Sequence, residues 1–238
     1  MLLLDVGNSR CKWALVQNGT WMQQGVAGNT EWLALQHTLA ALPAPSRILV
    51  SNVAGEAMAQ RLSAVCAGWK RTLEFVTASA GQCGVRNGYE QPQRLGSDRW
   101  AALIAARGRV ASACLVVCAG TATTVDWLDG DGLFRGGLIL PGFDLMRASL
   151  ARNTAQLPLA EGTYCREPRN TMDAIVSGCL HAQIGAIERM FGQIAAEPRA
   201  ICLLTGGAAQ RIAPLLSIPF ELIDNLILEG LLRFGASL

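Results

Sequence analysis

The sequence has 238 residues, of which 51% are hydrophobic and only 16% are charged, and its formal net charge is +2. This length suits one large domain or two of about 110 to 120 residues, and the composition excludes a disordered chain. Because the charge is nearly neutral and no run of Lys or Arg occurs, we expect neither nucleic acid nor a membrane surface as a partner.

Cysteine usage indicates the compartment. The eight Cys include no CxxC pair, and most stand among apolar neighbours. This is typical of buried thiols in a reducing environment, and the short apolar start LLL before Asp5 is no signal-peptide core, so we expect a cytoplasmic protein. The two His, His37 and His181, lie in helix-like stretches without an evident partner, which disfavours histidine-based catalysis.

The first half begins with strands. Residues 2–6 form an apolar run that enters a Gly turn, and a second strand follows up to a hairpin signal at Asn18-Gly19. Residues 47–54 are typical of a buried strand, and the next segment predicts a helix from Glu56 that ends at Gly68. Ser97 is a candidate N-cap for a helix that continues through residues 100–111.

The second half repeats the opening pattern. Residues 2–19 and 115–132 align without a gap, so that Asp5 falls on Cys118, and each copy ends in a hairpin signal. A strand over 135–142, helices over 143–152 and 171–196, and a strand within 200–209 follow. Alternating strands and helices with hairpins predict an α/β fold with mixed sheets, divided into similar halves at 1–112 and 113–238.

Three Gly turns, each after an apolar strand, are the first chemical signal: DVGNSRCK (5–12), CAGTATT (118–124) and LTGGAA (204–209). Neither a Walker P-loop nor GxGxxG occurs. Exposed N–H groups beside Thr, Ser or Asn suit phosphate oxygens, Lys12 suits terminal phosphates, and Asp5 suits a water-mediated Mg²⁺. Each turn alone is a common hairpin, but three together favour a bipartite nucleotide clamp.

Carboxylates supply the second signal. Asp98, in GSDR (96–99), stands at a predicted helix start, where the helix dipole keeps it ionised and able to accept a hydroxyl proton. Asp126, which closes the second turn region, is a competing acid that we rank below Asp98.

These motifs, in this order, resemble the acetate and sugar kinase, heat-shock-protein-70 and actin superfamily, and more narrowly the type III pantothenate kinases. The resemblance implies two ribonuclease-H-like domains with ATP in the cleft between them, and transfer of phosphate from ATP to pantothenate, the first step of coenzyme A biosynthesis. It implies that Asp98 is the proton acceptor. It implies pantothenate contacts from Tyr89, Gly96, Ser97, Asp98, Arg99 and Thr171. It implies ATP contacts from Asp5, Val6, Gly7, Asn8, Ser9, Arg10, Cys11, Lys12 and Thr121, with Gly206 and Gly207 near the adenosine.

The chain departs from the family pattern at Cys118. Many members carry Asp there, which binds the potassium or ammonium ion that those enzymes need. Since a neutral thiol is a poor ligand for a hard cation, we expect no monovalent-cation dependence, or a charge supplied in another way. The resemblance also implies a homodimer, and Gly178 and Gly185 in the long predicted helix would permit close helix packing.

Two alternatives stay open. A kinase of the same fold that acts on another small alcohol is disfavoured by Tyr89 and the GSDR pocket. A non-catalytic nucleotide-binding regulator is favoured by Cys118 alone. It is disfavoured by the intact residues Asp5, Lys12, Asp98 and Thr121.

Overall fold

The computed structural model describes residues 1–237, and the chain folds into two compact units. Unit 1 comprises Met1–Arg109 and the C-terminal segment that starts at Asn225, and unit 2 comprises Val110–Asp224. Both units combine helices with a mixed sheet, so the predicted α/β class with mixed sheets is confirmed. Within residues 1–237, no helix has the length and apolar character needed to cross a membrane.

Unit 1 is built on a sheet with the strand order β3-β2-β1-β4-β5, in which β1 is antiparallel to β2 and parallel to β4. The strands are β1 (Leu2–Val6), β2 (Arg10–Gln17), β3 (Thr20–Gly28), β4 (Ile48–Asn52) and β5 (Leu73–Phe75), and β6 (Gly81–Gln82) pairs with β7 (Val85–Asn87). The helices are α1 (Trp32–Ala40), α2 (Glu56–Cys66), α3 (Ser97–Arg109) and α7 (Leu226–Ala236), with 3-10 turns at Ala67–Trp69 and Pro92–Arg94.

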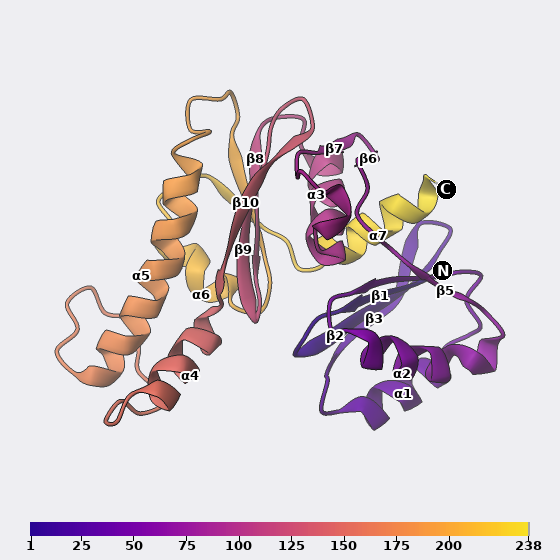
Figure 1. The fold of residues 1–238 in the computed structure, drawn as a ribbon, viewed down its shortest axis with the longest axis horizontal. Coiled ribbons are helices and arrows are strands. Elements are labelled where there is room, and N and C mark those ends of the chain that lie inside the picture. The colour runs from indigo at the N-terminus through magenta and orange to yellow at the C-terminus, as the bar shows by residue number, and fades with distance from the viewer. Residues whose placement is uncertain (238) are drawn as a thin grey trace. The chain divides into compact units, whose positions relative to one another are not determined.

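The two faces of this sheet carry different residues because side chains alternate along a strand. Leu2, Leu4 and Val6 of β1 belong to a core with Leu39 and Leu62, which are contributed by α1 and α2 (Figure 1). Asp5 lies on the opposite face of β1, and this second face is covered by α3 and α7. A charged residue therefore lies under the helix that begins at Ser97.

The C-terminal helix joins unit 1, which corrects the predicted division at 113–238. Helix α7 packs along α3, and Gly230 permits this because a Cβ there would overlap the carbonyl oxygen of Ala101. Arg109 and Glu229 add an ion pair at 2.6 Å. The predicted division rested on the similarity of residues 2–19 and 115–132. This similarity does not show which unit the C-terminal helix joins. The first boundary falls at Arg109 where the sequence predicted 112.

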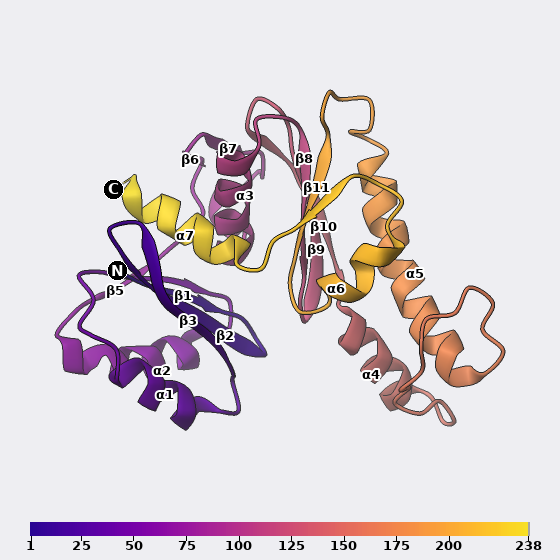
Figure 2. The ribbon, with the colours of Figure 1, turned by 180° about the vertical axis from the view of Figure 1, so that it is seen from behind.

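Unit 2 contributes the strand order β12-β11-β8-β9-β10 to its sheet. Its elements are β8 (Cys114–Ala119), β9 (Ala122–Leu128), β10 (Leu133–Pro141), α4 (Phe143–Asn153), α5 (Thr171–Phe191), β11 (Ile201–Thr205), α6 (Ala209–Ile212), a 3-10 turn (Ala213–Leu215) and β12 (Phe220–Leu222). Leu115, Val117 and Val125 pack against α5 through Ile184 and Ile187, and Figure 2 shows α4, α5 and α6 on this face.

The internal repeat is present in the topology. The order β3-β2-β1-β4-β5 of unit 1 matches β10-β9-β8-β11-β12 of unit 2, with antiparallel pairs among the first three strands and parallel pairs after them. The Asn18-Gly19 hairpin is confirmed, since both residues have positive φ, and Gly132 at the corresponding turn has a φ of 79°.

The C-terminal ends of α2 and α5 differ from the prediction. The helix from Glu56 ends at Cys66, and after a 3-10 turn the left-handed residue is Lys70 where we expected Gly68. The side chain of Asn170 caps α5 by accepting from the Asp173 N–H at 2.9 Å. Helix α5 ends at Phe191, because the next residues form turns, and not at 196.

Candidate functional site

The Gly turn of unit 1 is a tight connection between β1 and β2. The Gly7 N–H donates to the Arg10 carbonyl at 3.0 Å. The amide nitrogen of Asn29 donates to the carbonyls of Gly7 and Asn8 at 2.9 and 2.8 Å, which fixes the turn from outside. Sequence analysis missed Asn29 because it lies 21 residues beyond Asn8 in the chain. Asn8, Ser9 and Arg10 are exposed, and so are available to a ligand.

Three polar side chains follow one another across the sheet of unit 1. Asp5 is paired with Lys12 of β2 on one side and with Ser51 of β4 on the other. Directly paired residues point to the same face, so Lys12, Asp5 and Ser51 form a row. The pKa of Asp5 is raised to about 7, first by burial and then by the negative charge of Asp98, while Lys12 lowers it. The carboxyl groups of Asp5 and Asp98 are therefore electrostatically coupled.

Asp98 is held at the start of α3 by the backbone. Its Oδ1 accepts from the Arg99 N–H at 2.8 Å. Burial raises the pKa of Asp98, and the hydrogen bond from the Arg99 N–H opposes this rise. Gly96 leaves room for the carboxylate, because a Cβ at this position would lie 2.6 Å from Oδ1 of Asp98. An acid with a raised pKa, folded back over a glycine, is suited to accept a proton.

Ser97 does not act as the predicted N-cap. It is the first residue of α3, and the Trp100 N–H bonds to the Gly96 carbonyl at 2.9 Å. The Ser97 hydroxyl instead lies 3.0 Å from the hydroxyl of Ser51, which is fully buried. This contact joins the helix start to the sheet.

Arg99 and Tyr89 contact one another within unit 1. The guanidinium of Arg99 donates to the Tyr89 hydroxyl at 2.8 Å and lies 5.6 Å from the centre of the ring. Arg99 is buried, with 5% of its surface exposed. The Tyr89 N–H donates to the Asn87 side chain, which in turn donates to the Pro92 carbonyl, so the loop is fixed.

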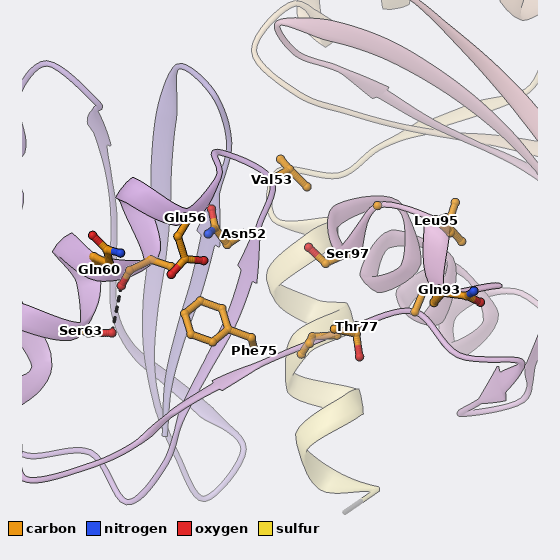
Figure 3. A pocket seen from close by; sticks show the side chains of 14 residues that line it. Asn52, Val53, Glu56, Gln60, Ser63, Phe75, Thr77, Gln93, Leu95 and Ser97 are labelled. Atoms are coloured by element: carbon orange, nitrogen blue, oxygen red, sulfur yellow. Dashed lines mark hydrogen bonds between the residues drawn. The ribbon is translucent and has the colours of Figure 1, made fainter. Parts of the chain in front are cut away.

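A pocket of about 590 Å³ adjoins this helix start in unit 1. Figure 3 shows Glu56, Gln60 and Ser63 of α2 on one side and Ser97 on the other, with Phe75 between them. Gly96 also lines the pocket. Two of the predicted pantothenate residues are therefore accessible from a cavity of ligand size.

In unit 2, the structure brings the second and third Gly turns together. The Gly120 N–H donates to the Ala122 carbonyl at 3.0 Å, as Gly7 does to Arg10 in unit 1, and Thr121 is exposed. Gly206, with a φ of +108°, packs so tightly on Ala119 that a Cβ would overlap its carbonyl oxygen. Cys118 is paired with Thr205 on one side and Thr124 on the other.

Thr171 lies exposed at the first turn of α5, beside a pocket of about 900 Å³ in unit 2. The pocket is mainly apolar, and Met146, Leu150 and Leu157 line it together with Thr171. The N-cap of α5 is Asn170, the residue before Thr171.

Asp126 does not close a turn. It lies inside β9 and is fully buried, paired with Val116 and Gly137. Gly137 is required there because a Cβ would overlap Oδ1 of Asp126. A buried carboxyl in the middle of a sheet does not have the exposure that a reacting acid needs.

Within residues 1–237, no three His, Cys, Asp or Glu side chains are grouped closely enough to hold a metal ion by themselves. The pair Asp5 and Asp98 suits Mg²⁺ nevertheless, since Mg²⁺ in kinases keeps several waters and uses one or two carboxylates plus phosphate oxygens. The two coupled carboxyl groups would each ionise more readily beside a divalent cation.

Solved structures define the class of fold. A structure described as a candidate 2-dehydro-3-deoxygalactonokinase from Sinorhizobium meliloti covers 98% of this chain and 97% of its own, with a TM-score of 0.64 at 15% identity. MreB5 of Spiroplasma citri bound to ADP covers 99% of this chain and 95% of its own, with a TM-score of 0.51 at 10% identity. The fold is therefore that of the sugar kinases and actin-like ATPases.

Sequence similarity defines the family. The type III pantothenate kinase family model matches residues 1–193. The type III pantothenate kinase of Aromatoleum aromaticum is 54% identical over 231 residues, covering 97% of this chain and 96% of the relative. That of an Azoarcus species is 52% identical over 239 residues, covering 100% and 91%. This chain belongs to the type III pantothenate kinase family.

Proposed function

We infer that this protein phosphorylates pantothenate with ATP, giving 4′-phosphopantothenate and ADP, the first step of coenzyme A biosynthesis. Membership of the family carries this inference. Asp98, with its raised pKa at the start of α3, supports it as the group that accepts the hydroxyl proton.

In the reaction, the substrate hydroxyl gives its proton to Asp98, and its oxygen forms a bond to the γ-phosphorus of ATP. The bond between the γ-phosphorus and the β,γ-bridging oxygen breaks, and ADP leaves. Little covalent chemistry is required of the protein, so positioning and charge stabilisation supply most of the rate. Mg²⁺, when bound, neutralises the phosphate charge, and Asp5 would hold it through water.

We propose that ATP contacts the two Gly turns, residues Asp5–Lys12 of unit 1 and Thr121 of unit 2. Lys12 would pair with the terminal phosphates, since it lies beside Asp5 in the sheet. Gly206 and Gly207 would approach the adenosine, because the backbone at Gly206 adopts a conformation that side chains disfavour.

Pantothenate would contact Gly96, Ser97, Asp98, Tyr89 and Arg99 around the start of α3. Pantothenate carries a carboxylate, for which a guanidinium is the natural partner. Because the Tyr89 hydroxyl accepts from Arg99, the pair would reorganise around the carboxylate.

We also propose a cytoplasmic homodimer in which Thr171 reaches a substrate pocket near the subunit interface. Several large apolar side chains of unit 2 are exposed, including Ile139 at 66% and Leu145 at 42%, and the apolar pocket beside Thr171 lies among such residues. Exposed apolar surface of this kind marks association sites. None of the described cysteines forms a disulfide, which fits a reducing compartment.

Cys118 favours one competing function, a nucleotide-binding regulator without catalysis. Asp5, Lys12 and Asp98 weigh against it, since the row and the coupled carboxyl groups would then have no role.

The test is pantothenate-dependent ADP release with Mg-ATP by the wild type and by Asp98→Asn. We expect turnover in the wild type and a loss of about 10²- to 10⁴-fold in the variant, the range usual for a general base. If the rate of ADP release does not depend on pantothenate, pantothenate is not the substrate. If the protein binds nucleotide but phosphorylates no alcohol tested, the regulator is favoured.

A further inference from the structure

We propose that Ser51 is a positioning residue for phosphoryl transfer: its buried hydroxyl ties Ser97, and with it the start of α3 that presents Asp98, to the central strands of unit 1. This proposal rests on the function proposed above, and it adds a residue outside the motifs that the family resemblance assigns.

The first argument is the place of Ser51 in the sheet. The other residues of β4 before it, Ile48, Leu49 and Val50, are apolar and fully buried, as expected for a central strand. Ser51 is also fully buried, yet polar. A buried hydroxyl group without a hydrogen bond costs free energy that Ala would not cost, so the Ser51 hydroxyl needs a hydrogen-bond partner.

That partner is the helix start. The Ser51 and Ser97 hydroxyl oxygens lie 3.0 Å apart, although the two residues are 46 positions apart in the chain. Ser97 immediately precedes Asp98, and Figure 3 shows Ser97 at the beginning of α3 on the border of the pocket. A hydrogen bond at this point therefore restrains the residue next to the proposed base.

The second argument is the register. Ser51 is the direct neighbour of Asp5, and Asp5 is the direct neighbour of Lys12. The hydroxyl pair thus joins the row that carries the proposed phosphate and Mg²⁺ contacts to the helix that carries the proposed base.

Two hydroxyl groups hold two protons and use one between their oxygens, so the second proton remains to be donated to a neighbouring acceptor. Removal of the Ser51 hydroxyl would therefore change both the position of Ser97 and the polarity beside Asp5. A displacement of about 1 Å in a catalytic group can cost about 10²-fold in rate.

The experiment compares Ser51→Thr with Ser51→Val, two side chains of the same shape that differ in the hydroxyl. We expect the Val variant to lose about 10-fold or more in kcat relative to the Thr variant, with little change in the KM for pantothenate. Thermal unfolding of both variants checks that they are folded alike.

Ser51→Ala, Ser97→Ala and the double variant complete a cycle and avoid the added methyl group. If the two hydroxyls act as one tie, the double variant should have the kcat of the worse single variant. Equal kcat in the Thr and Val variants would overturn the proposal, and so would strictly additive losses in the cycle. If the wild type itself fails to turn over pantothenate, the proposed function falls, and Ser51 has no reaction to serve; an active wild type with equal variants refutes Ser51 alone.

Discussion

Replacing Asp5 by Asn tests the electrostatics of unit 1, because the amide has nearly the shape of the carboxyl group and cannot ionise. In the folded protein the pKa of Asp5 rises from its ordinary value of 3.8 to about 7, through burial and the charge of Asp98. A rise of about 3 in pKa corresponds to about 4 kcal/mol of folding free energy.

The folded state binds the Asp5 proton more tightly than the unfolded state, so protonation of Asp5 stabilises the fold. The folded state has the higher pKa, so the stabilisation linked to Asp5 is complete below pH of about 4 and is lost as the pH rises through about 7. The wild type should therefore lose stability between about pH 4 and 7, and Asp5→Asn should lose about 3 to 4 kcal/mol less over the same range. Lys12 already reduces the shift, and its effect is contained in the value of about 7.

Urea unfolding at several pH values, without Mg²⁺ or nucleotide, measures this difference directly. Asp98→Asn is the matched comparison, since removal of its charge lowers the pKa of Asp5 and should reduce the pH dependence only in part. If the stability difference between wild type and Asp5→Asn does not change with pH, then Asp5 is ionised normally and the proposed coupling of the two carboxyl groups is wrong.

Three further predictions concern other parts of the site. The turnover rate of the wild type should be equal in sodium and potassium buffers, whereas the rate of Cys118→Asp should increase with potassium. A wild type that is inactive in sodium and active in potassium would contradict our interpretation of Cys118. Gly96→Ala should lower kcat by about 10-fold with a nearly unchanged melting temperature, since the new Cβ displaces the Asp98 carboxylate, and an unchanged kcat would contradict the role of that glycine. Leu145→Asp should convert a dimer to a monomer in sedimentation experiments, because a charge would be buried in an apolar interface; a dimer that persists would place the interface elsewhere.

Local patterns predicted much of this fold. The apolar runs and turn residues around Asn18-Gly19, residues 47–54 and residues 143–152 led to the correct elements, because hairpins and amphipathic helices depend on near neighbours in sequence. The internal repeat likewise predicted two similar sheets, which the matching strand orders confirm.

The missed features depend on contacts between distant parts of the chain. Asn29 fixes the Gly7 turn from 22 residues away, and Ser51 contacts Ser97 from 46 residues away. Helix α7 reaches back to α3 across the whole of unit 2 in sequence. The lone Ser in the apolar run RILVS was the one available signal for such a contact, since a polar residue in a buried strand needs a partner.

The two copies of the repeated hairpin show how one backbone scaffold can carry different chemistry. The position held by Asp5 in unit 1 is held by Cys118 in unit 2, and the cross-strand neighbour is Lys12 in the first copy and Thr124 in the second. The Gly turns are similar but not identical, because the Gly7 N–H bonds to the carbonyl of Arg10, whereas the Gly120 N–H bonds to the nearer carbonyl of Ala122. The backbone thus supplies two similar turns, while the pair of Asp5 and Lys12 occurs in the copy of unit 1. If ATP contacts both turns, the asymmetry assigns the metal and the proton-accepting chemistry to unit 1 and leaves unit 2 to bind phosphate through neutral groups, which is why we expect Cys118→Asp to add a cation requirement without abolishing transfer.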